Sequence, residues 1–106
     1  MQYKEEFTRT TNAFNYVFEK VIGAGDTVIL KMPPVSANKR GVGDIGWMAE
    51  KDTIAIFGTL AAKPEREEVL WQELLPNDLL NKTISAIKIE NHGDEDCRVC
   101  IRTILK

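Results

Sequence analysis

A chain of 106 residues is long enough for one domain with a buried core but too short for two, so we expect a single domain over residues 1–106. Its 14 basic and 16 acidic residues give a net charge of -2, which excludes the broadly basic surface of proteins that bind nucleic acid or an anionic membrane. The opening MQYKEEFTRTT lacks the apolar core of a signal peptide, and no later apolar run reaches the roughly 18 residues of a membrane span. The sequence therefore predicts a protein that is not secreted by a signal peptide and has neither nucleic acid nor a membrane as partner.

The opening residues alternate weakly between apolar and charged side chains, through Tyr3, Glu5 and Phe7. A period of two residues is typical of a β-strand, and charges along a strand protect a sheet edge from pairing with another chain. We therefore expect an edge strand here. Residues 13–22 repeat the alternation strongly, with four apolar side chains on one parity: Phe14, Tyr16, Phe18 and Ile22.

Glycine and proline mark the next boundaries. The segment GAGD, residues 23–26, is a turn, and residues 27–32 form a strand that Pro33 and Pro34 end, because proline cannot donate to a sheet. The following loop PPVSANKRGVGD, residues 33–44, approaches the length at which irregular loops tend to be functional. It is either a solvated loop or an arm that contacts a second subunit or an acidic partner, through these candidate residues: Ser36, Asn38, Lys39, Arg40 and Val42.

The second half of the chain predicts four more strands and one helix. Residues 45–50 and 53–60 alternate on either side of a two-residue turn, which predicts a β-hairpin. Residues 64–75 begin with proline and acids and then repeat leucine and tryptophan at helical spacing, so we expect one short helix there. Residues 83–90 and 97–105 are expected to be antiparallel neighbours. Together these elements predict an all-β domain, an antiparallel, jelly-roll-like β-sandwich with one short helix.

The segment GVGDIGW, residues 41–47, has the glycine spacing of a dinucleotide-binding loop. Such a loop needs a strand before the glycines and a helix after them, so that the helix N-terminus and backbone amides meet the pyrophosphate. Here the loop PPVSANKR precedes the glycines, and WMAEKDTIAIFG alternates like a hairpin after them. We therefore expect no nucleotide or other cofactor, and glycines that supply unusual backbone angles in a long connection.

Cys97 and Cys100 form a CxxC motif, which elsewhere is a redox pair or half of a zinc site. A redox pair lies at the start of a helix, whereas CRVCIRTIL alternates like a strand, where residues three apart face opposite sides. Cys97 is expected on the apolar face, and Cys100 on the other face between Arg98 and Arg102. Zinc would need a ligand beyond His92 and the two cysteines, so we expect two reduced thiols and no metal.

His92, the one histidine, lies beside Asp94, Glu95 and Asp96 in the turn NHGDED. A histidine–carboxylate pair can act as a general base, but the sequence places no serine or cysteine nucleophile with it. The turn could also ligate calcium, although it lacks the spacing of an EF-hand. The favoured interpretation is a solvated acidic turn in a protein that is not an enzyme and has no catalytic residue.

Trp47 and Trp71 are either flat platforms for sugar rings or large core residues. Trp47 shares a strand face with apolar neighbours, and Trp71 has helical spacing from two leucines. We therefore favour core positions for both, with a sugar platform as the alternative.

The run NKTISAIKIEN, residues 81–91, followed by CRVCIRTILK, residues 97–106, resembles the closing hairpin of small β-sandwich proteins among the virion components of tailed phages. This resemblance implies self-association, often threefold, and attachment to a capsid, tail or baseplate. It carries over no catalytic residue.

These observations predict a non-enzymatic structural or interaction module, located in a phage or prophage virion or otherwise in the cytoplasm. A homo-oligomer is expected because strands such as 14–22 and 53–60 are apolar on one face and partly so on the other, and one core covers only one face of each sheet. Other virion proteins are further candidate partners. The alternative is a carbohydrate-binding or host-recognition β-sandwich.

Overall fold

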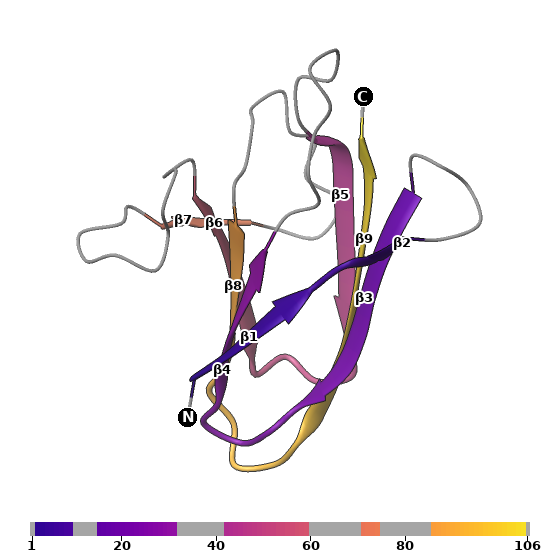
Figure 1. Ribbon diagram of the computed structural model, residues 1–106. Coiled ribbons are helices and arrows are strands. Elements are labelled where there is room, and N and C mark those ends of the chain that lie inside the picture. The colour runs from indigo at the N-terminus through magenta and orange to yellow at the C-terminus, as the bar shows by residue number, and fades with distance from the viewer. Residues whose placement is uncertain (1, 10–14, 32–41, 60–70, 75–85, 106) are drawn as a thin grey trace.

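The computed structural model describes residues 2–9, 15–31, 42–59, 71–74 and 86–105. They form β1 (Gln2–Glu6), β2 (Thr8–Arg9), β3 (Asn15–Ile22), β4 (Thr27–Lys31), β5 (Val42–Ala49), β6 (Ile54–Thr59), β7 (Gln72–Glu73), β8 (Ala86–Asn91) and β9 (Cys97–Leu105). One sheet has the strand order β1-β4-β8-β6-β7 and the other the order β2-β3-β9-β5 (Figure 1). The expected all-β, sandwich-like fold is confirmed.

Strands that follow each other in the chain often lie in opposite sheets. β5 pairs with β9 and β6 pairs with β8, so the hairpin expected from residues 45–60 is absent. β8 and β9 are likewise in different sheets, and the expectation that they are neighbours is wrong. The physical reason is that a period of two shows which face of a strand is buried but not which strand lies next to it. A short connection can cross a sandwich as readily as it can reverse within one sheet.

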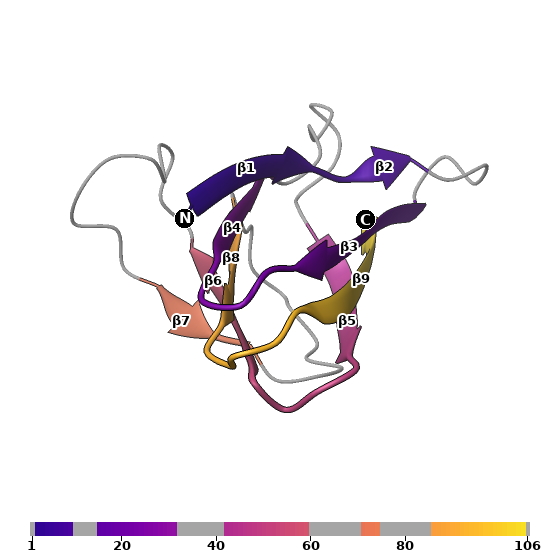
Figure 2. The same cartoon turned by 90° about the horizontal axis from the view of Figure 1, so that it is seen from below.

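β1 forms an edge of the five-stranded sheet, as its charges predict, but it runs parallel to its neighbour β4. The expected sandwich is therefore antiparallel in every pairing of the described strands except this one. After β1 the chain passes Phe7, which packs against the core, and enters the other sheet as β2. The first strands thus close one side of the sandwich, as the view from below shows (Figure 2).

The core lies between the sheets and is built from alternate residues of the facing strands. Its buried side chains are Phe18, Ile22, Val28, Leu30, Ile54, Ile56, Leu74, Ile87, Ile89, Cys97, Val99 and Ile101. The faces assigned from the period of two are confirmed at Phe18, Ile22, Val28, Leu30, Ile54, Ile56, Cys97, Val99 and Ile101. Three further residues expected on the same faces lie outside the described residues: Phe14, Met32 and Leu60.

Two segments differ from the sequence prediction. Most of the helix expected at residues 64–75 falls outside the described residues, but residues 71–74 contain β7, which pairs with β6. The Leu74 amide also donates to the Ile56 carbonyl at 2.8 Å. The backbone of this segment therefore forms its hydrogen bonds with the edge of a sheet and not within a helix. The loop expected at residues 33–44 is shorter at its end, because Val42 already pairs with β9. Among the described residues, no helix has the length and apolar character needed to cross a membrane.

Candidate functional site

Three connections meet at one end of the sandwich: residues 23–26 between β3 and β4, residues 50–53 between β5 and β6, and residues 92–96 between β8 and β9. Each passes from one sheet to the other, and all three lie at the bottom of Figure 1, away from the C-terminus. Because these residues carry six carboxylates, we call them the acidic end. Segments far apart in the sequence thus form one surface.

The side chain of Asn91, the last residue of β8, holds the three connections together. Its Nδ2 donates to the carbonyls of Ile22 at 3.0 Å and Glu95 at 2.9 Å. Its Oδ1 accepts hydrogen bonds from Thr53 Oγ1 and from the Gly93 amide, both at 3.0 Å. The buried amide thereby uses two donors and two acceptor positions, which is its full hydrogen-bonding capacity.

The backbone of Asn91 extends this network. Its carbonyl accepts from the Gly25 amide and its own amide donates to the Asp26 carbonyl, both at 3.0 Å. The His92 amide donates to the Thr53 carbonyl at 2.9 Å. Gly25 has φ 73°, a left-handed conformation that glycine adopts without steric strain. The acidic end is therefore fixed by hydrogen bonds in the free protein.

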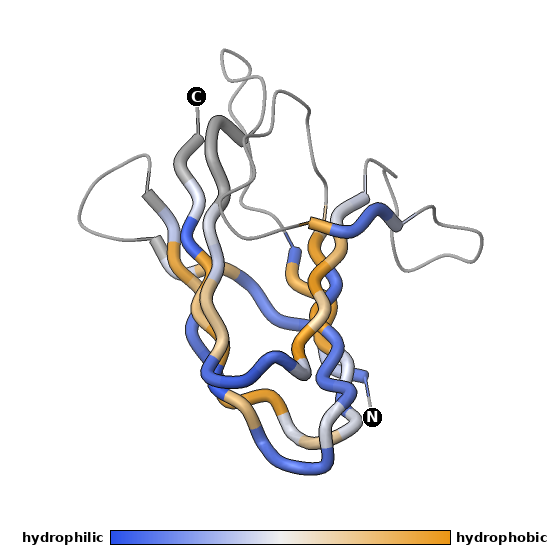
Figure 3. Tube along the Cα trace, turned by 180° about the vertical axis from the view of Figure 1, so that it is seen from behind, coloured by the Kyte–Doolittle hydropathy of each residue, from blue (hydrophilic) through white to orange (hydrophobic). Residues whose placement is uncertain are grey.

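The acidic end concentrates the negative charge of the chain. It holds six of the 16 acidic residues and one of the 14 basic residues, so its formal charge is -5 while the remaining residues sum to +3. The charged residues are Asp26, Glu50, Asp52, Asp94, Glu95 and Asp96, with Lys51 as the one base. Figure 3 shows hydrophilic tube at this end and apolar segments in the strands beyond it. Outside the acidic end, the described residues hold seven bases and six acids, so the negative charge of the described residues is concentrated at this end.

Lys51 joins two of the connections. Its ammonium pairs with the Glu95 carboxylate and donates to the Asp96 carbonyl at 3.2 Å. The hydrogen bond from Lys51 holds the pKa of Glu95 below its ordinary value, and the same bond raises the pKa of Lys51. Asp96 Oδ1 in turn accepts from the Ala24 amide at 3.3 Å. Both members of the ion pair are charged at neutral pH.

Asp52 and Asp94 are the least constrained carboxylates of this end. Both side chains are exposed, and neither forms an ion pair or hydrogen bond with another residue of the described ranges. Their charges face solvent, where they are open to an approaching partner. They can also be substituted without removing a bond of the Asn91 network.

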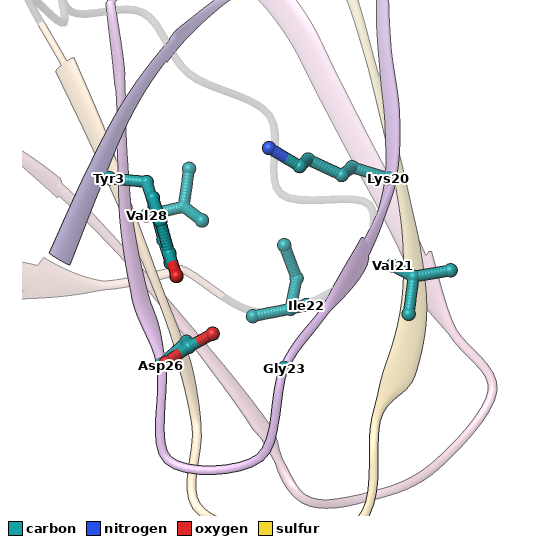
Figure 4. Close-up of a pocket in the computed structure, with 7 residues that line it drawn as sticks. All are labelled: Tyr3, Lys20, Val21, Ile22, Gly23, Asp26 and Val28. Atoms are coloured by element: carbon teal, nitrogen blue, oxygen red, sulfur yellow. The ribbon is translucent and has the colours of Figure 1, made fainter. Parts of the chain in front are cut away.

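A pocket of about 280 Å³ opens beside the acidic end, where β1 and β3 separate (Figure 4). Its lining residues are Tyr3, Lys20, Val21, Ile22, Gly23, Asp26 and Val28. The Lys20 ammonium pairs with Glu5 and lies 5.6 Å from the centre of the Tyr3 ring. Lys20 and Asp26 lie at opposite ends of the pocket in Figure 4.

The outer face of the four-stranded sheet is a second exposed surface. Met48 on β5 is 73% exposed, and Val21 on β3 is 45% exposed. Arg98 on β9 pairs with Glu19 at 3.2 Å and with Glu50 at 3.6 Å. This face thus carries both exposed apolar side chains and ion pairs.

The structure places few of the expected site residues together. Ser36, Asn38, Lys39 and Arg40 lie outside the described residues, so their role in an interaction loop stays a prediction. Val42, in contrast, is the first residue of β5 and belongs to a strand. From Val42 onward the glycine-rich segment is strand with a bulge, which corrects its assignment to a long connection.

The two tryptophans do not form one platform. Trp47 packs against the core, as expected, and donates its Nε1–H to the Leu74 carbonyl at 3.3 Å. Trp71 lies instead beside Lys88, whose ammonium is 5.1 Å from the centre of its ring and 4.9 Å from that of Phe57. The residues on either side of Lys88 are buried, so Lys88 and Trp71 lie on the outer face of the five-stranded sheet.

The CxxC pair is divided between the faces of β9 as the sequence predicts. Cys97 is buried in the core and Cys100 is half-buried on the outer face, and neither is in a disulfide. His92 does not pair with the acids that follow it, because its Nε2 lies 3.1 Å from Glu90 Oε1. Within the described ranges, no three histidine, cysteine or acidic side chains are grouped closely enough to hold a metal ion.

Sequence reasoning missed Asn91, the residue that organises the acidic end. It placed Asn91 in a turn-rich connection, whereas the structure shows a buried strand residue. One signal was present: an asparagine two residues before Gly93 is the pattern of an Asx turn, in which the side-chain oxygen accepts from that amide. A second bond, to the Glu95 carbonyl, lies within the same connection, but the bonds to Ile22 and Thr53 join distant segments that no local pattern connects.

No protein-family model and no curated protein matches this chain. Among solved structures, it is similar to the crystal structure of a mutant of PliG-Ec, a periplasmic lysozyme inhibitor of g-type lysozyme from Escherichia coli. The TM-score is 0.50, the sequence identity is 7%, and 100% of each chain is covered. At this identity the similarity shows a shared fold.

This similarity corrects the functional expectations. A phage or prophage virion module, its carbohydrate-binding alternative and a virion or cytoplasmic location were expected, but the matching structure is that of a bacterial periplasmic inhibitor. The virion expectation arose from a closing-hairpin pattern, yet β8 and β9 lie in different sheets and form no hairpin. Alternating apolar residues are common to all β-sandwiches, so this pattern indicates the fold but not the function.

Proposed function

We propose that this chain is a periplasmic protein-binding domain that binds a basic protein through its acidic end. The observation that carries the proposal is the formal charge of -5 on three connections that Asn91 locks together. A fixed array of carboxylates attracts a basic surface without first having to be ordered. Binding, and not catalysis, is the activity assigned to it.

The charge array favours fast and specific association. Charges gathered on one end produce a field that steers an oppositely charged protein and orients it before contact. Because the carboxylates are exposed, salt screens the attraction, and affinity is expected to fall as ionic strength rises.

A g-type lysozyme is the partner to test first. The fold is shared with an inhibitor of such a lysozyme, which supports a protein partner of this class. A periplasmic location is part of the proposal for the same reason. The acidic end is proposed as the contact surface because of the charges of this chain, and not because of the similarity to the inhibitor.

The test is calorimetric titration of a basic g-type lysozyme with the intact chain, together with an assay of cell-wall hydrolysis. We expect saturable binding and reduced hydrolysis. The double substitution Asp52→Lys with Asp94→Lys changes the acidic end from -5 to -1. It is expected to weaken binding by about tenfold or more, because like charges then face the partner.

The matched control is Glu6→Lys with Glu73→Lys, which alters two exposed carboxylates of β1 and β7, outside the acidic end. Both double variants change the net charge from -2 to +2, so only the location differs. Retained affinity in the control supports the acidic end as the binding surface. Equal weakening in both variants, or no saturable binding by the intact chain, would overturn the proposal.

Self-association is a second proposal, and it rests on the outer face of the four-stranded sheet. Met48 and Val21 are large apolar side chains that remain exposed there. A second copy would cover them. Sedimentation equilibrium over a wide concentration range is expected to show a species heavier than 12.0 kDa, and a mass that stays at this value throughout would refute it.

A further inference from the structure

We propose that the pocket between β1 and β3 receives an arginine side chain of the protein partner. This inference rests on the proposed function, since it names the group that the partner inserts beside the acidic end. The pocket and the acidic end share Gly23 and Asp26, so a protein bound at that end covers the pocket mouth. One side chain can then enter while the surrounding surface stays in contact.

The size of the pocket fits a single side chain. Its volume of about 280 Å³ lies just below the range of roughly 300 to 1,000 Å³ typical of pockets that enclose whole small molecules. A long side chain that enters from a bound protein needs less room than a cofactor or substrate. Such an anchor in a preformed pocket is a common source of binding energy between proteins.

The walls of the pocket suit the stem of an arginine. Ile22 and Val28 close the base of the pocket, where each is only 1% exposed because it packs in the core. The Tyr3 ring forms the wall on the β1 side (Figure 4). Methylene groups pack against such apolar walls while the charged head reaches a polar group.

The charges of the pocket favour a cation. Lys20 is already paired with Glu5, and Asp26 adds a carboxylate at the opposite end, so these three residues have a formal charge of -1. The negative field of the acidic end adds to this preference. A guanidinium is the better cation here because its planar fork can donate two parallel hydrogen bonds to a carboxylate and can stack on an aromatic ring.

The turn at residues 23–26 places the Asp26 carboxylate at the pocket. The Asp26 amide donates to the Gly23 carbonyl at 3.0 Å, which closes the turn. A Cβ at position 23 would overlap Asp26 Oδ2, so only glycine leaves space for the carboxylate to fold back over the turn. The substitution Gly23→Ala is therefore expected to move the carboxylate while it leaves the charge of the chain unchanged.

The test uses small probes, so that it does not depend on the identity of the partner. Nitrogen-15 spectra of the intact chain are recorded during titration with N-acetylarginine amide and, separately, with N-acetylcitrulline amide, its uncharged analogue. We expect saturable shifts of the Gly23, Asp26 and Val28 amides with arginine alone. The dissociation constant of one side chain is expected on the order of 1 mM.

Two variants that act on the carboxylate and one control complete the test. Asp26→Asn is expected to weaken arginine binding about tenfold, the usual effect of losing a hydrogen bond to a charged group. Gly23→Ala is expected to weaken arginine binding as well. This variant replaces Asp26→Asn in the test if Asp26→Asn unfolds the turn. Met48→Ala is the control, because this side chain is exposed on the outer face of the four-stranded sheet, does not line the pocket and should leave the shifts unchanged.

The outcomes separate this inference from the proposed function. Equal shifts with citrulline, absence of saturable shifts, or shifts that persist in both pocket variants would overturn the arginine pocket. None of these results bears on binding of a basic protein, which the Asp52→Lys and Asp94→Lys variant tests. If the chain shows the arginine shifts but binds no basic protein, the arginine pocket is supported and the proposed function is refuted.

Discussion

The acidic end and the outer face of the four-stranded sheet are both exposed to solvent, but they are held in different ways. The connections of the acidic end depend on one buried amide, that of Asn91, which bonds to four residues from three separate segments. The outer face depends on the backbone ladder of β3, β9 and β5, which repeats along each strand. The end is therefore sensitive to single substitutions, and the face is tolerant of them.

This difference bears on function. A surface built from connections can place charges from distant parts of the chain within one area, which a flat sheet face does only along its strands. The placement requires that each connection be fixed, because loose loops would spread the charges and lose entropy on binding. Asn91 supplies that restraint at the acidic end.

The largest effect is expected for Asn91→Ala. The substitution leaves two carbonyls, one hydroxyl and one amide without their partner at a buried position, and it opens a small cavity. We expect the free energy of unfolding to fall by about 3 kcal/mol. Urea denaturation measures it, and a loss below about 1 kcal/mol would show that water or the backbone replaces the amide.

Gly93→Ala is expected to have the next largest effect. A Cβ at position 93 would lie 2.8 Å from Thr53 Cγ2 and 2.9 Å from Thr53 Cβ, so the connections at residues 50–53 and 92–96 must separate. We expect a loss of about 1 to 2 kcal/mol, which is typical of overpacking. Thr53→Ser removes the methyl group and keeps the hydroxyl. A double-mutant cycle should therefore show a smaller loss in the serine background, and strict additivity would show that the Thr53 methyl group does not take part in the clash.

A smaller, pH-dependent effect is expected from the Lys51 and Glu95 pair. The pKa of Glu95 is lowered by the hydrogen bond from Lys51, so the pair stabilises the fold above the ordinary glutamate pKa and loses this contribution as pH falls through the lowered value. In Lys51→Gln the Glu95 pKa is expected to rise toward its ordinary value. Carboxyl carbon NMR titration measures this, and an unchanged pKa would place its cause elsewhere.

The smallest effect on stability is expected on the sheet face. Met48→Ala removes a side chain that is 73% exposed, so the free energy of unfolding should change by no more than about 0.5 kcal/mol. The same substitution should reduce self-association if that face is an interface. A stability loss above about 1 kcal/mol would mean that Met48 packs against its own chain and that the contrast between the two surfaces is wrong.

The sequence predicted the strands and their buried faces well. Phe18, Val28 and Val99 all point into the core because alternation along a strand is a local property that survives in any sandwich. The same rule separated Cys97 from Cys100 on opposite faces of one strand. The expected helix failed in residues 71–74 because helical spacing of apolar residues was read without knowing that β6 offers its edge to this segment.

The candidate site itself was only half visible in the sequence. The acidic turn at residues 92–96 was recognised, but its joining to residues 23–26 and 50–53 was not, since the two expected hairpins would have kept these connections in separate places. Trp71 shows the same limit, because its contact with Lys88 depends on which strand lies next to β7. Local patterns report the environment of a residue but not its distant neighbours.

By itself, the sequence determined the all-β class and the inward-facing side chains of the strands, because burial of apolar surface imposes a period that can be read from each strand alone. Only the tertiary structure decided that consecutive strands cross between the sheets, that Asn91 is buried among three connections, and that six carboxylates share one end. The physical reason is that strand pairing and side-chain hydrogen bonds join residues far apart in the chain. Their free energy depends on the whole assembled sandwich and leaves little trace in any short segment.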